Sequence, residues 1–288
     1  MTGGAAQVAA FGRAIVVGAA GGMGRMFLER LEASGCPTLG VDLRGDGRVT
    51  AEDVLAPSPE FRAALAGAGL VILAVPDEVA CRAGAGIAAA MDCAAVLADC
   101  TSVKAPYVSA VGQAGACGLI SVNPLFGPGL DWTGRTVVVT EIRAAQHPGR
   151  LERFLEGAGL RIVRLDADSH DRLAAEAQAQ VHAAVLAFIL SASPEGMVFD
   201  TPPNRVMRML AARILSGEAH VYRKIQTSNP FAGPARARLA EALRRLDAAC
   251  AADDPAAFAG LLDEARARLG PEAGDLAARC ARLFATLP

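Results

Sequence analysis

The chain has 288 residues, of which 52% are hydrophobic and 20% are charged, with a formal net charge of −2. This length is sufficient for one large domain or two ordinary ones with well-buried cores. The sequence pI is about 6.1. Nucleic acid and anionic membrane surfaces are therefore not expected partners, since both select proteins with concentrated positive charge.

Three features of the sequence favour the cytoplasm. No apolar run is expected to reach the length of a transmembrane helix. Residues 1–11 lack the basic segment of a signal peptide. The seven cysteines form neither a Cys-x-x-Cys pair nor a group with histidine at the spacing of metal ligands. Isolated thiols in odd number fit a reducing compartment, so we expect neither disulfides nor a metal site.

Apolar segments alternate with helical segments along the first part of the chain. This alternation predicts an α/β fold with a doubly wound, parallel sheet of the Rossmann type. The predicted strands are 13–17, 38–43, 70–75, 96–99, 119–122, 136–140 and 161–165, and the predicted helices between them are 25–34, 61–68 and 148–156.

After Asp166 the pattern changes to long helical segments without a credible strand. The predicted helices are 170–191, 205–216, 220–228, 235–251 and 255–269. We therefore expect two domains, an α/β domain at 1–165 and an all-α domain at 166–288. The C-terminal helices of the second domain carry more apolar residues than a small domain needs, which predicts a homodimer. These apolar residues are Leu239, Leu243, Leu246, Phe258, Leu261, Leu262, Leu283 and Phe284.

A glycine-rich segment follows the first predicted strand and opens the first helix, Gly18-Ala19-Ala20-Gly21-Gly22-Met23-Gly24. Such a turn places backbone N–H groups and a helix N-terminus against a diphosphate. The second and third glycines of the usual Gly-x-Gly-x-x-Gly motif match Gly21 and Gly24, but its first position is Ala19. Because such turns also occur without a ligand, the motif alone is weak evidence.

Asp42 strengthens the interpretation of a dinucleotide site. It ends the second predicted strand, at about the 20-residue interval of the carboxylate that binds the adenosine ribose. A carboxylate there would repel a 2′-phosphate, so NAD is favoured over NADP, although Arg44 lies nearby. The expected cofactor-binding residues are Gly18, Gly21, Gly22, Met23, Gly24, Asp42, Val75 and Pro76.

Three further segments carry candidate chemistry: Asp99-Cys100-Thr101-Ser102-Val103-Lys104, Asn123-Pro124-Leu125-Phe126-Gly127-Pro128, and the helix that starts at His170-Asp171 and carries Gln178 and His182. With the glycine-rich loop, they resemble the prephenate dehydrogenase family, which oxidatively decarboxylates prephenate or arogenate toward tyrosine. The resemblance runs from about Arg13 to Asn229. It is greatest to the enterobacterial type fused to chorismate mutase, although no mutase segment is evident in this sequence.

The resemblance implies roles for individual residues. Ser102 matches the family serine that hydrogen-bonds the substituent at ring carbon C4. His182 matches a histidine that lines the substrate pocket, and Gln178, four residues earlier, is expected on the same helix face. Arg213 matches the arginine that binds a substrate carboxylate, for which a planar guanidinium is well suited. The resemblance also implies NAD as cofactor and a homodimer.

Other residues of these segments are interpreted from their surroundings. The apolar neighbours of Arg213 predict that its side chain is half-buried. His170 and Asp171 are expected to begin a helix rather than to take part in chemistry, with Asp171 or a neighbouring serine as its cap. Lys104 fits a structural cation as well as a catalytic one, and Cys100 fits a packed thiol better than a nucleophile.

One position departs from the family. The family segment that matches Asn123-Pro124-Leu125-Phe126-Gly127-Pro128 begins with a histidine, which accepts the proton of the ring hydroxyl as hydride leaves for the nicotinamide. A carboxamide can donate and accept hydrogen bonds, but it does not titrate near neutral pH. Asn123 therefore cannot be the general base that oxidation of an alcohol calls for.

An amine at ring carbon C4 would suit an asparagine. The lone pair of a neutral amine can expel hydride without a base on the enzyme, and loss of CO₂ then gives an aromatic amine. We therefore favour 4-amino-4-deoxyprephenate as the substrate, which is converted to 4-aminophenylpyruvate in antibiotic biosynthesis. Asn123, Ser102 and His182 are then the expected catalytic residues, and Arg213 and Gln178 the expected substrate-binding ones.

Two other hypotheses remain open. The protein is a prephenate or arogenate dehydrogenase of aromatic amino acid biosynthesis that has moved its base to His182 or to a bound water. Alternatively, it is a paralogue that binds a dinucleotide without catalysis. The hypothesis of a non-catalytic paralogue is disfavoured by the presence of Ser102, His182 and Arg213 together, because a site that had lost catalysis would have little reason to keep a carboxylate-binding arginine.

Overall fold

The computed structural model describes residues 11–193, 199–217 and 219–287. Residues 1–10, in which no signal peptide was expected, lie outside the described part. The chain divides into two compact units, Met1–Ala174 and Ala175–Pro288. We describe each unit by itself.

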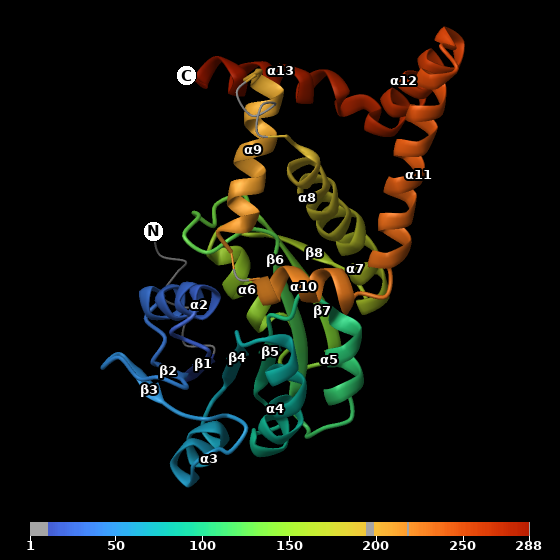
Figure 1. Ribbon diagram of the computed structural model, residues 1–288. Coiled ribbons are helices and arrows are strands. Elements are labelled where there is room, and N and C mark those ends of the chain that lie inside the picture. The colour runs from blue at the N-terminus through green and yellow to red at the C-terminus, as the bar shows by residue number, and fades with distance from the viewer. Residues whose placement is uncertain (1–10, 194–198, 218, 288) are drawn as a thin grey trace. The chain divides into compact units, whose positions relative to one another are not determined.

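The first unit is built on an eight-stranded sheet with the order β3-β2-β1-β4-β5-β6-β7-β8 (Figure 1). The strands are β1 (Ala14–Val17), β2 (Thr38–Asp42), β3 (Val49–Ala51), β4 (Leu70–Leu73), β5 (Val96–Asp99), β6 (Gly118–Pro124), β7 (Thr136–Arg143) and β8 (Arg161–Arg164). The helices are α2 (Gly22–Ala33), α3 (Pro59–Ala66), α4 (Asp77–Ala90), α5 (Lys104–Val111), α6 (Arg150–Gly157) and α7 (Ala167–Ala174). The predicted Rossmann-type α/β fold is confirmed.

The sheet is parallel only from β1 to β6. Strand β7 pairs antiparallel with β6, and β8 pairs parallel with β7, so the last two strands run against the other six. The expectation of an all-parallel sheet is wrong at this edge. The segment between Pro124 and Thr136 contains no helix, and a parallel neighbour needs a crossover of about a dozen residues or more, usually helical. The chain therefore returns beside β6 in the opposite direction.

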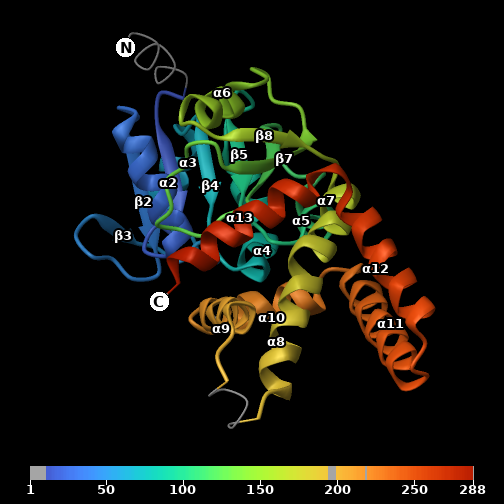
Figure 2. The same cartoon turned by 90° about the horizontal axis from the view of Figure 1, so that it is seen from above.

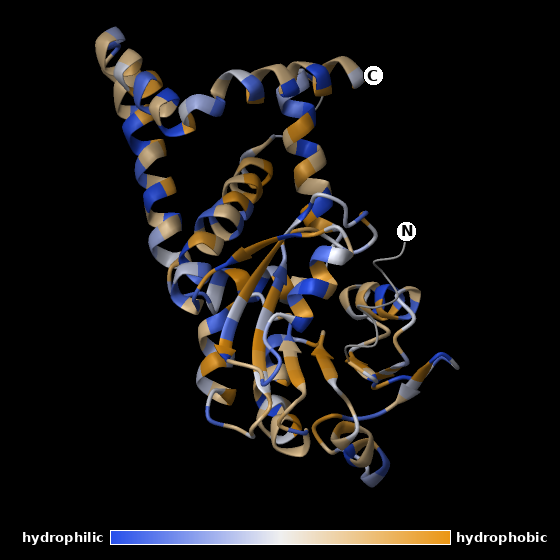
Figure 3. Cartoon of the chain, turned by 180° about the vertical axis from the view of Figure 1, so that it is seen from behind, coloured by the Kyte–Doolittle hydropathy of each residue, from blue (hydrophilic) through white to orange (hydrophobic). Residues whose placement is uncertain are grey.

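Helices cover both faces of the sheet, because successive side chains of a buried strand point to opposite sides. On β1, Ala14 and Val16 join the core that contains residues of α2 and α6. Ile15 and Val17 join the core that contains residues of α3, α4 and α5. Figure 2 shows α6 and α4 on opposite sides of the sheet. The strands are predominantly hydrophobic (Figure 3), as burial on both faces requires.

The described residues of the second unit contain helices and no strand, as predicted. It begins with a π-helical turn, η1 (Ala175–Gln180), followed by α8 (Val181–Ser191), α9 (Pro202–Leu215), α10 (Ala219–Thr227), α11 (Ala232–Ala251), α12 (Pro255–Leu269), the 3₁₀ turn η2 (Gly270–Glu272) and α13 (Ala273–Thr286). Its small cores join α8 to α9 and η1 to α10 and α11. No described residue of α12 or α13 is buried.

The boundary between the two units follows Ala174, later in the chain than the predicted boundary between residues 165 and 166. The reason is α7, which the sequence pattern groups with the helices that follow it. Asp171 of α7 accepts hydrogen bonds from the backbone N–H groups of Lys104 and Ala105 at the start of α5. These bonds hold α7 in the sheet unit.

The helix from Ala167 to Ser191 is long and apolar enough, by length and composition, to cross a membrane. The expectation that no run of this kind exists is therefore wrong. Val185 of α8 nevertheless packs against Ala211 and Ile214 of α9, which is how a helix of a globular domain uses its apolar stripe.

Candidate active site

The carboxyl ends of five strands meet along one edge of the sheet. Val17 is in register with Val41 and Leu73, Leu73 with Asp99, and Asp99 with Ser121. The residues that follow, among them Gly18, Asp42 and Cys100, therefore lie level with one another. The strand order reverses between β1 and β4, and open α/β sheets bind their ligands at such a switch point.

The glycine-rich loop fits a diphosphate. Gly18 has a φ of +81°, a conformation that side chains strongly disfavour. A Cβ on Gly24 would lie 2.0 Å from the carbonyl oxygen of Gly18, so both positions require glycine. Gly21 directly precedes α2 and provides no side-chain cap. The first hydrogen bond of the helix is donated by the N–H of Arg25 to the carbonyl oxygen of Gly21. The N–H groups of the first turn therefore remain for an anion.

The other predicted cofactor residues lie beside this loop. The Ala20 N–H donates to Oδ2 of Asp42 over 3.1 Å, which places the carboxylate at the rim of the loop. A Cβ on Gly18 would be 3.0 Å from Cγ1 of Val75, and Pro76 directly precedes α4. The structure thus brings together residues from the ends of β1, β2 and β4.

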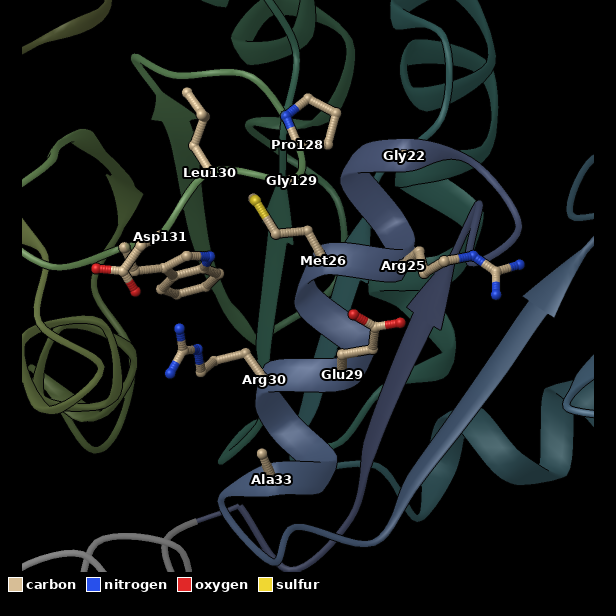
Figure 4. A pocket seen from close by; sticks show the side chains of 11 residues that line it. Gly22, Arg25, Met26, Glu29, Arg30, Ala33, Pro128, Gly129, Leu130 and Asp131 are labelled. Atoms are coloured by element: carbon tan, nitrogen blue, oxygen red, sulfur yellow. The ribbon is translucent and has the colours of Figure 1, made fainter.

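The segment that begins at Asn123 reaches the same loop. A Cβ on Gly22 would lie 2.9 Å from Cγ of Pro128, so the loop and the segment are in close contact. A cleft of about 690 Å³ runs between α2 and residues 128–132 (Figure 4). It follows the outer side of α2 and touches only Gly22 and no other predicted site residue. The other predicted site residues of the first unit lie outside this cleft.

Asn123 forms a buried hydrogen-bond network with α7. Its Nδ2 lies 2.9 Å from Nε2 of His170, and the side chains are only 7% and 2% exposed. Nδ1 of His170 lies 2.8 Å from Oδ1 of Asp171. Asp171 in turn accepts the N–H groups of Lys104 over 2.8 Å and of Ala105 over 2.9 Å.

This network overturns the expectation that His170 and Asp171 serve only to begin their own helix. Asp171 binds the N-terminus of α5 instead, where the helix dipole stabilises a carboxylate. The start of α7 is held by Asp166, which accepts the N–H and the hydroxyl of Ser169 over 2.8 Å each. The sequence signal that was missed is an adjacent His-Asp pair on the buried side of an otherwise polar helix.

Burial lowers the pKa of His170, and Lys104 acts in the same direction, whereas Asp171 and Asp99 oppose the shift. Desolvation disfavours the imidazolium, so His170 is neutral at neutral pH. Its partner Asn123 does not titrate. Asn123 and His170 therefore form a neutral pair of buried side chains near the end of β6.

Lys104 is a structural cation. It is fully buried, and its Nζ donates to the carbonyl oxygens of Thr101 over 2.7 Å and Val122 over 2.9 Å. Asp99 lies 3.9 Å away. Burial lowers the pKa of Lys104, and the charge of Asp99 opposes that shift. The contacts tie the end of β5 to β6, which carries Asn123.

Ser102 lies at the edge of the sheet and is half-buried. Its N–H donates to Oδ1 of Asp77, the first residue of α4, over 3.3 Å. The preceding Thr101 donates its N–H and hydroxyl to Asp99 over 2.9 and 2.6 Å. These bonds fix the turn that presents Ser102. Burial raises the pKa of the Cys100 thiol, which keeps it protonated and unsuited to nucleophilic attack.

The remaining predicted residues belong to the second unit. Gln178 lies in the π-helical turn η1, a feature often found at functional sites, and not in the regular α-helix that the sequence predicted. His182 packs edge-to-face on Tyr222, with ring centroids 5.1 Å apart. Its Nδ1 is buried without a hydrogen-bond partner among the described residues, and burial lowers its pKa.

Arg213 is exposed in the single chain, which corrects the expectation that it is half-buried. Of its apolar neighbours, Met209, Leu210 and Leu215 are also exposed. Helix α9 buries only Ala211 and Ile214, so its apolar residues do not enclose the arginine within the second unit.

The described residues contain no group of three or more His, Cys, Asp or Glu side chains that could hold a metal ion. All seven cysteines lie in the described part of the chain, and none of them forms a disulfide.

The chain is similar to several known proteins, although no protein-family model matches it. It is 41% identical to a 4-amino-4-deoxyprephenate dehydrogenase from Streptomyces pristinaespiralis, over 96% of this chain and 98% of that protein. It is 28% identical to a T-protein from Enterobacter agglomerans, over 75% of this chain and 56% of that protein. Similarity to the enterobacterial type is thus lower than to the Streptomyces protein.

Among solved structures, the chain resembles the prephenate dehydrogenase from A. aeolicus in complex with hydroxyphenyl propionate and NAD⁺. The TM-score is 0.69 at 18% identity, over 89% of this chain and 96% of that one. This likeness concerns the fold, and the Streptomyces relative extends it to sequence along nearly the whole length. The chain therefore belongs to the prephenate dehydrogenase family of oxidoreductases.

Proposed function

We propose that this protein catalyses the NAD-dependent oxidative decarboxylation of 4-amino-4-deoxyprephenate to 4-aminophenylpyruvate. The observation that carries the proposal is Asn123, which stands at the carboxyl end of β6 where the family has a basic histidine. Its amide is buried against a neutral His170. The 41% identical relative is itself named a 4-amino-4-deoxyprephenate dehydrogenase.

The chemistry explains why an amide suffices. Hydride loss from C4 leaves electron deficiency on that carbon, which a neutral amine relieves with its nitrogen lone pair. The C–C bond to the ring carboxylate then breaks, CO₂ leaves, and its electron pair completes the aromatic ring. The amine becomes an iminium and ends as a neutral arylamine, so no proton has to be removed at the hydride step. A hydroxyl is a weaker electron donor and gains from a base, typically by 10²–10⁴-fold.

NAD, when bound, supplies the acceptor for the hydride. The residues at the strand ends fit this cofactor: the uncapped first turn of α2 would hold the diphosphate, and Gly18 and Gly24 would permit its close approach. Asp42 at the rim of the loop accepts ribose hydroxyls and repels a 2′-phosphate. Met23, Val75 and Pro76 complete the lining of this site.

The substrate contacts follow from the family resemblance. Ser102 hydrogen-bonds the C4 substituent, and Arg213 binds a substrate carboxylate with its planar guanidinium. The resemblance also assigns His182 and Gln178 to the lining of the substrate pocket, and Nδ1 of His182 has no hydrogen-bond partner among the described residues. His170 is not expected to act as a base itself, because its Nε2 already contacts Asn123.

The assembly and location of the enzyme form part of the proposal. A homodimer is supported by α12 and α13, in which no described residue is buried, and by exposed apolar side chains such as Leu243 and Leu283. Seven cysteines without a disulfide support a cytoplasmic location, and the substrate is a small molecule rather than nucleic acid or membrane.

The products test the reaction. Purified protein, NAD and 4-amino-4-deoxyprephenate should give 4-aminophenylpyruvate, CO₂ and NADH in equal amounts, measured by mass spectrometry and absorbance. Absence of aminated product under conditions in which prephenate is oxidised would refute the proposal. Absence of turnover with either substrate would favour the non-catalytic alternative.

A further inference from the structure

We propose that His170 is a positioning residue that fixes the orientation of the Asn123 amide, so that the amide oxygen faces the C4 amino group of the substrate. This inference rests on the proposed function, because it assigns a task to the amide in that reaction. It concerns side chains that the sequence alone did not connect.

The hydrogen-bond directions start at the N-terminus of α5. The backbone N–H groups of Lys104 and Ala105 can only donate, and they donate to the two oxygens of Asp171. A carboxylate that accepts two backbone donors at a helix N-terminus is held in its ionised form. An ionised carboxylate is an acceptor only, so Nδ1 of His170, 2.8 Å away, must carry the hydrogen.

The tautomer of His170 follows. A neutral imidazole with a proton on Nδ1 has an unprotonated Nε2, which is an acceptor. The imidazolium is disfavoured because the ring is 2% exposed and because the Lys104 charge opposes it, although Asp171 and Asp99 favour it. The group that faces Nε2 at 2.9 Å must therefore donate. On Asn123 only Nδ2 can do so.

The two polar atoms of a carboxamide point in diverging directions, so an Nδ2 held against His170 directs Oδ1 away from it. Asn123 stands at the strand-end edge, in a segment that contacts the cofactor loop through Pro128. There Oδ1 accepts an N–H of the substrate amine and leaves its lone pair free. A reversed amide would aim N–H at that lone pair and withdraw the electrons that expel the hydride. The orientation therefore bears directly on the rate.

The first arm of the test is spectroscopic and needs no substrate. Nitrogen-15 NMR of the whole, unaltered protein reports which ring nitrogen of each of the four histidines carries a proton. The His170 signal is assigned by its loss in His170→Gln. We expect neutral His170 with the proton on Nδ1 at pH 7.5. A proton on Nε2, or an imidazolium, would overturn the inference.

The second arm is kinetic. His170→Leu removes the acceptor, and kcat with 4-amino-4-deoxyprephenate should fall by about tenfold or more, while Kd for NAD stays unchanged. His170→Gln offers an amide oxygen to Asn123 and should retain most of kcat. His147→Asn alters an exposed histidine and should match the unaltered enzyme.

Unchanged kcat in a folded His170→Leu enzyme, or equal losses in the Leu and Gln variants, would overturn the positioning role while leaving the proposed function intact. Failure of the proposed function would show separately, as lack of turnover of the aminated substrate by the unaltered enzyme.

Discussion

At the level of single residues, the proposed function depends on one amide, that of Asn123, at a position where the family has a histidine. The sequence alone placed Asn123, Ser102 and the glycines of the cofactor loop, because each belongs to a short local motif. It could not place His170 and Asp171. Their partners lie 47 and 67 positions away in the chain, and only the packing of α7 on the sheet unit brings them together.

The substitution Asn123→His should restore a base where a hydroxyl proton must leave. The new ring can donate one N–H to Nε2 of His170 and keep its other nitrogen for proton transfer. We expect kcat/KM for prephenate to rise by at least about tenfold, within the range of general-base catalysis. The aminated substrate should gain nothing, since its lone pair already assists hydride loss.

Asn123→Gln is the matched control for this change, because it moves the amide without adding a base. It should not raise the rate with prephenate. An equal rise of kcat/KM for both substrates in Asn123→His would contradict the proposal that only the hydroxyl substrate needs a base.

Burial of His170 also predicts a dependence of stability on pH. The pKa of His170 is lowered in the folded state. As the pH decreases, His170 is therefore protonated in the unfolded chain, near its ordinary pKa of about 6.5, before it is protonated in the folded protein. The stability is fully present above that pH and falls as the pH decreases below it, by at most about 1.4 kcal/mol per pH unit. Tm measured from pH 7.5 to 5.5 should therefore decline less steeply in His170→Gln.

His147→Gln, at an exposed position, should keep the pH dependence of the unaltered protein. His182, whose pKa is also lowered by burial, should leave a residual slope in both variants. Identical slopes in His170→Gln and the unaltered protein would mean that His170 is not held neutral by the fold.

At the level of elements, strands were easier to predict than helices in the first unit. Short runs of Val, Ile and Leu sufficed for most strands. Helices α4 and α5 were missed: α4 contains Gly84 and Gly86, which lower helix propensity, and α5 lacks an apolar stripe. The three-residue β3 is too short to leave a pattern. The reversal of β7 depends on which strand it pairs with, which no local signal contains.

The cofactor loop gives a prediction at this scale. In Gly24→Ala the new Cβ would approach the Gly18 carbonyl oxygen to 2.0 Å, so the turn into α2 must open. We expect a lower Tm and an NAD affinity reduced by at least about tenfold, because the backbone N–H groups that bind the diphosphate move. Calorimetric titration measures the affinity.

Gly86→Ala is the matched control, since a Cβ there meets nothing within 4 Å on the exposed side of α4. It should raise stability by about 0.5–1 kcal/mol and leave NAD binding unchanged. Normal NAD binding by Gly24→Ala would contradict the assignment of this loop to the diphosphate.

At the level of the whole molecule, the change from an α/β unit to a helical unit could be predicted from the sequence pattern, but the place of division could not. The apolar residues of the C-terminal helices were recognised as a surplus, and the structure leaves many of them exposed. Exposure of this kind predicts an interface. A pattern of apolar residues does not say whether they face a core or a second subunit.

The homodimer can be tested by sedimentation equilibrium at micromolar concentration. We expect twice the mass of the 29.5 kDa chain. Leu243→Glu introduces a charge on an exposed apolar position of α11 and should favour the monomer, because burying an unpaired charge is costly. Leu55→Glu in the first unit should leave the dimer intact. A monomeric unaltered protein would contradict the prediction.

The central claim is that the active site is built for an amine at ring carbon C4. The most direct measurement compares kcat/KM for 4-amino-4-deoxyprephenate, prephenate and arogenate on the unaltered protein with NAD. We expect the aminated substrate to exceed both others by at least about a hundredfold, the lower bound of what a missing general base costs. A kcat/KM for prephenate or arogenate that equals or exceeds that for the amine would contradict the claim.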